Sequence, residues 1–541
     1  MTLQVYEAPG PGTWEQDATH FPRPVTQYLF DVFAQPFMRG WKEGTGRYGL
    51  LFSHLEPALI NGFLYYKVND VDPDDGQEVE RRFKAAGEAL ESKLWGEDLD
   101  LWDREFMPDS IQRNGALQSV VLQDLDTEGL LAHLTAVRDN VAEMVYRHHK
   151  FSITAIIPVG LYLANAMEWT GMDAGQLLAP LKGSSPVSLG AKVELGRLAR
   201  AISDAAIGAK DFDGAPADET LDGLTQRDDA VGEATRAYLD TIGLRLAGGY
   251  DIADPCAIEL PDMLLGTIWA AAGVVGEDRS DDWTEAAGRV RAAVPEEHRE
   301  RFDELLGEAR KMNRIRDERG LYNDNWGTGI ARTAILEAGR RLVESGRIRE
   351  AQSALDMTFD ELAAILRGAE NPSKDELDER TDRRLNTPLD EVPPILGPEL
   401  PPPPPLDGLP PDVAQMMGAF GATLGEVFSA PPDKADTAIT GRPVSPGVVT
   451  GIARIIGHPE ECNRLQQGDV LVTASTSSAF NVVLPLLGAI VTDRGGQLSH
   501  AAIVAREYGI PAVVGTTNAT DMIPDGARVT VDGAAGTVEI V

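Results

Sequence analysis

The sequence contains few cysteines and few basic residues for its length. Only two of its 541 residues are cysteine. They show no metal-ligand spacing, so we expect reduced thiols in a cytoplasmic protein. Lys and Arg number 49 against 85 Asp and Glu, which gives a formal net charge of −36. Because so acidic a surface repels nucleic acid and anionic membranes, we expect neither as a partner.

The sequence also lacks membrane-targeting and nucleotide-binding patterns. Its most apolar stretches, 153–166 and 482–491, are shorter than the roughly 20 residues that span a bilayer. The N-terminus has no signal-peptide pattern. No Gly-x-x-x-x-Gly-Lys-Ser/Thr phosphate loop occurs in the chain. We therefore expect a cytoplasmic protein that does not bind ATP through such a loop.

Composition divides the chain into three parts and predicts a multidomain protein. Residues 1–370 carry apolar residues at helical spacing and are predicted to form a large, mainly α-helical domain. Residues 371–438 are rich in proline and charge, with five successive prolines at 401–405. This composition predicts a linker or hinge with a short helix. The proline run is expected to be a spacer, with an SH3-type ligand as the alternative. Residues 439–541 predict a small α/β domain.

The expected elements follow from periodicity and turn residues. Helices are predicted at 26–38, 87–95, 127–147, 193–206, 230–242, 331–345, 359–367, 411–428 and 500–508. A strand or hairpin is predicted at 61–68, and strands are predicted at 448–456, 469–473, 489–491, 512–514, 528–532 and 537–541.

His500 is the most informative residue of the small domain. Gly495 and Gly496 precede it and admit backbone conformations closed to other residues, and Ser499 is a good helix N-cap. The first turn of a helix offers N–H groups and the positive end of the helix dipole, which stabilise a phosphate. Neutral imidazole is also nucleophilic near pH 7, so a phosphorylated catalytic histidine at His500 is one hypothesis. The alternative is an ordinary surface or capping residue, which a lone histidine at a helix start usually is. Gly495, Gly496 and Ser499 are predicted to bind its phosphate.

The segment around His500 resembles a known family. Residues 495–515, GGQLSHAAIVAREYGIPAVVG, are similar to the signature of the phosphohistidine swivelling domain of PEP-utilising enzymes. GRPVSPGVVTGIAR at 441–454 resembles the strand and turn that open that domain. The family includes PEP synthase, pyruvate phosphate dikinase, rifampin phosphotransferase and phenylphosphate synthase. The resemblance implies that His500 carries a phosphoryl group between two distant sites.

Two other domains of that family are not apparent in the sequence. Nothing resembles its ATP-grasp domain, and the chain stops at Val541 without a PEP/pyruvate barrel. The resemblance therefore implies a two-component dikinase. A separate ATP-grasp subunit would bind ATP and Mg²⁺ and load His500, and this chain alone would hold neither cofactor.

The helical part is expected to bind the acceptor. FPRPVT at 21–26 and YLDTIGLRLAGGYDIADP at 238–255 resemble the acceptor domains of rifampin phosphotransferases and of phenol-phosphorylating subunits, although Leu244 replaces a histidine found in many relatives. Because a separate ATP subunit resembles the phenylphosphate synthase arrangement, we expect a small phenolic acceptor. A phenol or a lignin-derived 4-hydroxyphenyl ketone fits this class. The alternatives are a rifamycin-type antibiotic phosphotransferase and a non-catalytic phosphocarrier or regulator.

Phosphoryl transfer needs positive charge near the moving phosphate. Arg314, Arg316 and Arg319 lie in KMNRIRDER at 311–319, a stretch similar to the basic stretch of rifampin phosphotransferases. We predict these arginines to be catalytic, with a solvated, salt-bridged helix face as the alternative. No metal ligands are expected.

A base for the acceptor hydroxyl and an aromatic pocket are also expected, though histidines and aromatic residues are more often structural. The candidate bases are His20, His54, His148 and His149. The candidate pocket residues are Phe21, Tyr28, Phe33, Phe37, Trp41, Tyr65 and Tyr66.

Overall fold

The chain forms two compact units. The computed structural model describes residues 6–18, 20–185, 190–212, 214–247, 249–273, 283–387, 392–399, 405–427, 439–457, 459–476, 480 and 483–541. Unit 1 comprises Met1–Ile157, Tyr250–Ala253 and Glu318–Gly418; unit 2 comprises Pro158–Gly249, Asp254–Asp317 and Ala419–Val541. This division differs from the predicted parts, because residues 158–249 and 254–317 group with the C-terminal domain rather than with the N-terminal helices.

Unit 1 contains an antiparallel sheet with the strand order β2-β3-β1-β4. Its strands are β1 (Trp14–Gln16), β2 (Phe52–Ile60), β3 (Phe63–Asp70) and β4 (Ile395–Leu396). Asn61 and Gly62 join β2 to β3 with φ angles of 52° and 88°. Positive φ at both residues is what a tight two-residue hairpin requires, and the predicted hairpin at 61–68 is confirmed.

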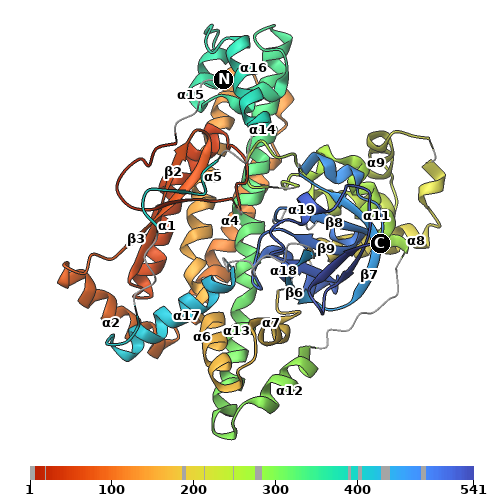
Figure 1. Cartoon of the computed structure of the whole chain (residues 1–541). Helices are drawn as coiled ribbons and strands as arrows, with labels where there is room; N and C mark the ends of the chain where they lie inside the picture. The colour runs from red at the N-terminus through yellow and green to blue at the C-terminus, as the bar shows by residue number, and fades with distance from the viewer. Residues whose placement is uncertain are drawn as a thin grey trace. The chain divides into compact units, whose positions relative to one another are not determined.

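Helices pack against this sheet and against one another within unit 1. Helix α1 (Gln27–Arg47) begins at the N-cap Thr26, whose side chain accepts a hydrogen bond from Leu29 N, and it packs along β2 and α5 (Figure 1). The other helical segments of the unit are α2 (Gly76–Ser92), α3 (Leu94–Leu101), η1 (Trp102–Phe106), α4 (Met107–Gln118), η2 (Leu122–Asp124), α5 (Thr127–Lys150), η7 (Gly320–Asp324), α14 (Asn325–Glu344), η8 (Ala351–Asp356), α15 (Phe359–Leu366) and α16 (Lys374–Asn386).

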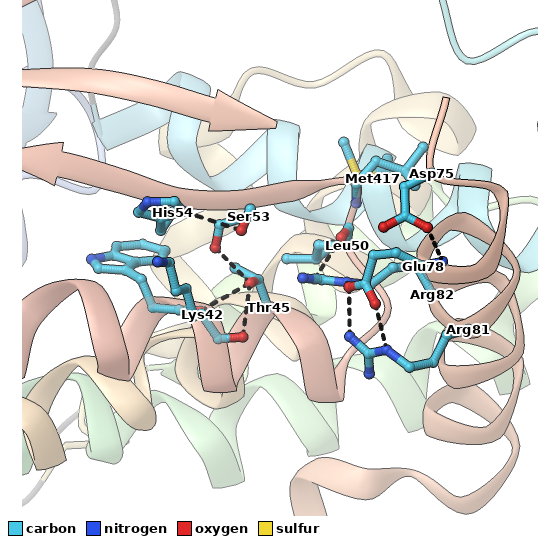
Figure 2. A network of polar contacts seen from close by, with 12 residues as sticks. Lys42, Thr45, Leu50, Ser53, His54, Asp75, Glu78, Arg81, Arg82 and Met417 are labelled. Carbon is cyan, nitrogen blue, oxygen red and sulfur yellow. Dashed lines mark hydrogen bonds and ion pairs between the residues drawn. The ribbon is translucent and has the colours of Figure 1, made fainter. Parts of the chain in front are cut away.

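The junction between α1, β2 and α2 is fixed by a polar network (Figure 2). Thr45 Oγ1 donates to the carbonyl of Ser53 over 2.7 Å, and Arg82 donates to the carbonyl of Leu50 over 2.9 Å. Gly49 lies between these contacts with a φ of 68°, and a Cβ there would come within 2.3 Å of Ala86 N and of Arg82 O. The turn after α1 therefore requires glycine for conformation and for space.

Gly49→Ala is expected to destabilise unit 1 by about 3 kcal/mol, because left-handed strain and overpacking against backbone atoms each cost about 1–2 kcal/mol. Gly346→Ala is the matched control, since Gly346 has a φ of 67° and nothing within 4 Å of a Cβ. Gly346→Ala should therefore lose only the stability that left-handed strain costs. Urea unfolding midpoints of both variants measure the difference, and equal shifts would contradict the expected clash.

The interval 371–438, predicted as a linker with one short helix, contributes more to the fold than predicted. Helix α16 is capped by Ser373 and buries Leu377 completely, and β4 pairs with β1. The predicted helix at 411–428 is present as α17 (Pro411–Val427). The proline run at 401–405, apart from its last residue, and the hinge at 429–437 lie outside the described residues.

Unit 2 is built on a mixed sheet with the strand order β5-β12-β11-β7-β8-β9-β10-β6. Its strands are β5 (Ile439–Thr440), β6 (Arg442–Ser445), β7 (Val448–Ile455), β8 (Asp469–Thr473), β9 (Leu487–Thr492), β10 (Ala512–Val514), β11 (Arg528–Asp532) and β12 (Thr537–Ile540). The strands from β7 to β10 in this order are parallel, and the other pairs are antiparallel. The predicted strands of this domain are present.

Both faces of this sheet are covered. Alternation along β8 directs Leu471 into one core and Val470 and Val472 into another, as the two-residue period of a strand requires. The first core also contains residues of helices α8, α10 and α11 and of α18. The helices of unit 2 include α6 (Ser152–Thr170, from residue 158), α7 (Ala174–Leu178), α8 (Gly190–Asp204), α9 (Ala217–Thr225), α10 (Ala230–Ile242), α11 (Pro261–Gly273), α12 (Trp283–Ala293), α13 (Arg299–Arg319, to residue 317), α18 (His500–Tyr508) and α19 (Ala519–Met522).

One helical stretch in the described part of the chain, Thr127–Thr170, is long and apolar enough to cross a membrane by length and composition alone. Within the protein, 78% of its most apolar window is buried. That burial is the pattern of a core helix.

Candidate functional site

A glycine turn presents His500 at the start of a helix. Strand β9 ends at Thr492, and the turn that follows has Gly495 at a φ of 112°, where a Cβ would come within 2.8 Å of Ser499 Oγ. Ser499 is the N-cap of α18, and its side chain accepts a hydrogen bond from Ala502 N. His500 is the first residue of α18. The predicted turn, cap and helix start are therefore all present.

The turn is also held from the neighbouring strand ends. Asp493 N donates to the carbonyl of Thr473 over 3.1 Å, and Arg494 N donates to that of Ala474 over 2.9 Å. The Asp493 side chain accepts hydrogen bonds from Thr516 and from the backbone and hydroxyl of Thr520. The backbone before His500 is thus fixed before any ligand binds.

The His500 ring is half-buried and oriented by a threonine. Its Nδ1 lies 3.0 Å from the hydroxyl of Thr476. Burial, and secondly the charge of Arg316, lower the pKa of His500 to about 3. The imidazole is therefore neutral throughout the physiological pH range, which is the protonation state a nucleophilic nitrogen needs.

Two guanidinium groups belong to the same surroundings. Arg316 of α13 donates to the carbonyl of Leu498, two residues before His500. Arg506 of α18 donates to the side-chain and backbone oxygens of Gln497. Burial and the charge of Arg316 lower the pKa of Arg506 to about 10, so Arg506 is still charged at pH 7. Positive charge and a helix N-terminus together suit a phosphate.

The predicted site residues are only partly brought together. Arg316 acts on His500 within unit 2. Arg319 belongs to unit 1, where it donates to the carbonyl of His148 over 3.1 Å and to Ser152 Oγ over 2.6 Å. Arg314 is half-buried on α13. Gly496 is buried, but its φ is not positive, so its backbone does not require glycine as that of Gly495 does.

The candidate bases separate into two groups in unit 1. His20, His148 and His149 interact electrostatically with one another. His54 contacts Ser53 on β2, and burial lowers its pKa to about 4.

The candidate aromatic residues separate in the same way. Phe33, Phe37 and Trp41 pack against His149, Phe21 packs on Phe33 and Tyr66 stacks on Phe37. Tyr65 instead donates to the carbonyl of Pro393, and Tyr28 is buried with a raised pKa.

Two residues of the His500 site had no predicted role. Thr476 follows β8, and Arg506 lies within α18. A signal for Thr476 exists, since β8 and β9 are predicted strands that lie parallel, with Thr473 opposite Thr492. Residues that follow two parallel neighbours meet at the same sheet edge. No cluster of three or more His, Cys, Asp or Glu that could hold a metal ion occurs in the described part of the chain.

Two family models match this chain. Residues 465–536, which include His500, match the PEP-utilising enzyme mobile domain, and residues 148–335 match the rifampicin phosphotransferase fourth domain. The second match includes α13 and the two adjacent histidines at the end of α5.

Curated relatives match the same regions. A rifampicin phosphotransferase of Streptomyces sviceus is 29% identical over 339 residues, covering 57% of this chain and 34% of the relative. A rifampicin phosphotransferase of Bacillus cereus is 32% identical over 212 residues, covering 39% of this chain and 22% of the relative. A probable phosphoenolpyruvate synthase of Staphylothermus marinus is 48% identical over 107 residues, covering 19% of this chain and 13% of the relative. The chain thus spans about a third or less of the length of each of these relatives.

Proposed function

We propose that this chain, which carries the mobile domain of PEP-utilising enzymes, is the carrier and acceptor-binding component of an ATP-dependent dikinase. A separate ATP-grasp subunit, holding ATP and Mg²⁺, phosphorylates His500. The chain then transfers the phosphoryl group to the hydroxyl of a small phenolic compound, such as phenol or a 4-hydroxyphenyl ketone. The overall products are AMP, phosphate and the phosphorylated acceptor. We place the protein in the cytoplasm.

The observation that carries this proposal is the environment of His500. A neutral imidazole at a helix N-terminus, with Thr476 on Nδ1 and Arg316 and Arg506 nearby, is suited to accept and release a phosphoryl group. We infer that Nδ1 carries the proton and donates it to the Thr476 hydroxyl, which leaves the lone pair of the ring on Nε2. Nε2 is then the nitrogen that attacks phosphorus.

A rifamycin-type antibiotic is the second candidate acceptor. It is favoured by the match of residues 148–335 to the rifampicin phosphotransferase fourth domain and by the names of two curated relatives. The phenolic acceptor is favoured by the aromatic side chains that pack against His149 in unit 1. A non-catalytic carrier would use the same histidine without a small-molecule product.

One experiment separates these candidates. The chain is incubated with Mg²⁺, ATP and the ATP-grasp protein encoded nearest to it, and with either a panel of phenols or rifampicin. Nucleotides are separated by chromatography, and acceptors are analysed by mass spectrometry. AMP together with an aryl phosphate supports the proposal, and phosphorylated rifampicin supports the second candidate. Phosphohistidine without any product indicates a carrier, and formation of ADP alone contradicts dikinase chemistry.

Thr476→Val is expected to slow phosphorylation of His500 about 10- to 100-fold, which is the value of a hydrogen bond to a group that becomes charged. Valine keeps the branched shape but cannot accept the Nδ1 proton, so the ring is no longer held with its lone pair on Nε2. Thr476→Ser keeps the hydroxyl and should stay close to wild type. Single-turnover phosphohistidine formation measures both, and equal rates for the two variants would show that the hydroxyl has no orienting role.

A further inference from the structure

Two adjacent histidines at the C-terminal end of α5 form the centre of a second polar cluster, which lies wholly within unit 1. The rings of His148 and His149 have centroids 4.6 Å apart. His148 Nδ1 lies 2.9 Å from Asp324 Oδ1, with side-chain exposures of 17% and 18%. His149 Nδ1 lies 2.8 Å from the carbonyl of Val145.

These contacts fix where the protons lie. A carbonyl oxygen can only accept, so His149 carries its proton on Nδ1; a carboxylate likewise favours the proton on Nδ1 of His148. Burial lowers the pKa of both rings, and the charges of Arg319 and His20 lower them further, while Asp324 opposes the shift at His148. Both rings are therefore neutral at pH 7 and carry their lone pairs on Nε2.

The pairing of His148 with Asp324 is the arrangement of a general base. A carboxylate that holds Nδ1–H orients the imidazole and stabilises the cation formed when Nε2 takes up a proton. Asp324 is the last residue of η7 (Gly320–Asp324), a π-helical turn that precedes α14. Such turns occur frequently at functional sites because the extra residue redirects a side chain.

Aromatic rings from α1 pack against His149. Phe33, Phe37 and Trp41 are spaced four residues apart and so share one face of the helix. Their ring centroids lie 5.8, 4.5 and 6.4 Å from that of His149. Tyr66 of β3 stacks on Phe37 at 5.2 Å. A further aromatic ring would make the same kind of edge-to-face and stacked contacts beside this layer.

Trp41 adds a polar group to this apolar layer. Its Nε1 is buried and has no hydrogen-bond partner among the described residues. A buried indole N–H usually finds an acceptor. An oxygen on an aromatic ligand, such as the carbonyl of a hydroxyphenyl ketone, would be one.

We propose that this group (Phe33, Phe37, Trp41, His148, His149 and Asp324, called here the His148 cluster) binds a single-ring phenol as the phosphoryl acceptor, with His148 as the base. The inference rests on the proposed function and adds the acceptor site to it. In the transfer step the phenol oxygen bonds to phosphorus as the bond from phosphorus to Nε2 of His500 breaks. The electron pair of that bond returns to Nε2, His500 keeps its Nδ1 proton, and the phenol proton passes to Nε2 of His148.

The test measures discharge separately from loading. The chain is phosphorylated with potassium phosphoramidate, with His500→Ala as the background, and is then mixed with 4-hydroxyacetophenone or 4-nitrophenol. Loss of phosphohistidine and appearance of aryl phosphate are followed in a single turnover. His148→Gln should slow discharge to 4-hydroxyacetophenone about 100-fold, within the range of general-base catalysis, and leave loading unchanged. 4-Nitrophenol is more acidic and needs less help from a base. Discharge to it should therefore slow by a smaller factor in His148→Gln.

Matched variants control for folding. Asp324→Asn keeps the shape of the side chain but removes the carboxylate. It should slow discharge to 4-hydroxyacetophenone nearly as much as His148→Gln does. His133→Gln is the control, because His133 lies on the same helix and burial also lowers its pKa, but it lies outside the cluster. Circular dichroism and thermal melts check that each variant folds. Equal discharge by His148→Gln and wild type overturns the assignment of the base.

Binding to the unphosphorylated chain tests the acceptor site without any chemistry. Trp41→Phe keeps an aromatic ring but removes the indole N–H, and should weaken calorimetric binding of 4-hydroxyacetophenone about tenfold. Unchanged binding overturns the role given to Trp41. Discharge by wild type to neither phenol would overturn both the proposed acceptor class and this inference, whereas equal discharge by His148→Gln and wild type overturns the inference alone.

Discussion

His500→Ala is expected to abolish phosphorylation of the chain and all transfer to an acceptor, with a loss of about 10⁴-fold or more, because the covalent intermediate can no longer form. The phosphorylated nitrogen is part of the reaction itself, so neighbouring groups cannot replace it. The measurement is incorporation of labelled phosphate from ATP in the presence of the ATP-grasp subunit. The label should be acid-labile and alkali-stable, as a phosphoramidate is.

His298→Ala is the matched control for this loss. His298 is another histidine of unit 2, stacked on Trp169 at 4.9 Å, and its removal should leave labelling unchanged. The alanine at position 500 continues α18 and leaves the Ser499 cap in place, so the fold should survive, as a thermal melt can verify. Labelling that persists in His500→Ala would move the phosphorylated residue elsewhere and contradict the assignment.

The C-terminal domain could be predicted from local sequence because its pattern is local. Strands β8, β10 and β11 and helix α18 begin and end at the predicted residues, since each is a short apolar stretch bounded by Gly, Pro or Asp-Gly turns. In unit 1, by contrast, β1 pairs with β4 across most of the chain, and both strands are very short. No local pattern marks such a pair.

The division into units was not predictable from composition. Helix α13 (Arg299–Arg319) begins in unit 2 and ends in unit 1, and no change of composition marks the crossing. The resemblance of residues 311–319 to a basic stretch grouped Arg316 and Arg319 as one cluster, whereas their contacts belong to different units. Likewise α16 is so rich in charge that its sequence resembles a linker, and its burial rests largely on Leu377.

The candidate site shows the same limit. His500, Gly495 and the Ser499 cap lie in one short segment, so sequence spacing was enough to predict their geometry. The contacts to Thr476 and Arg316 join residues far apart in the chain, and residue type alone does not reveal them. The pairing of His148 with Asp324 spans 176 positions and depends on the packing of α5 against η7. The histidines could be named as candidates, but only the fold distinguishes one from another.

Arg316→Met is expected to slow phosphoryl transfer through His500 about 10²- to 10³-fold, the range for removing one preorganised charge from a developing oxyanion. Methionine keeps most of the length of the side chain but loses the donors that bind the Leu498 carbonyl and the charge beside His500. Lys311→Met removes one positive charge from an exposed position of the same helix and should have little effect. Single-turnover loading rates compare the two variants. Equal losses of rate would show that Arg316 contributes only as a general surface charge.

Arg316→Met should also change the pH dependence of loading. Arg316 is the second cause, after burial, of the lowered pKa of His500. Its removal should therefore raise that pKa from about 3, while burial keeps it below 6.5. Loading requires the neutral ring, so as pH falls the variant should lose activity at a higher pH than wild type. Arg316→Lys keeps the charge but not the planar fork, and should retain the wild-type pH profile with a reduced rate. A histidine NMR titration measures the pKa directly, and identical values in wild type and Arg316→Met would show that the guanidinium does not act on the ring.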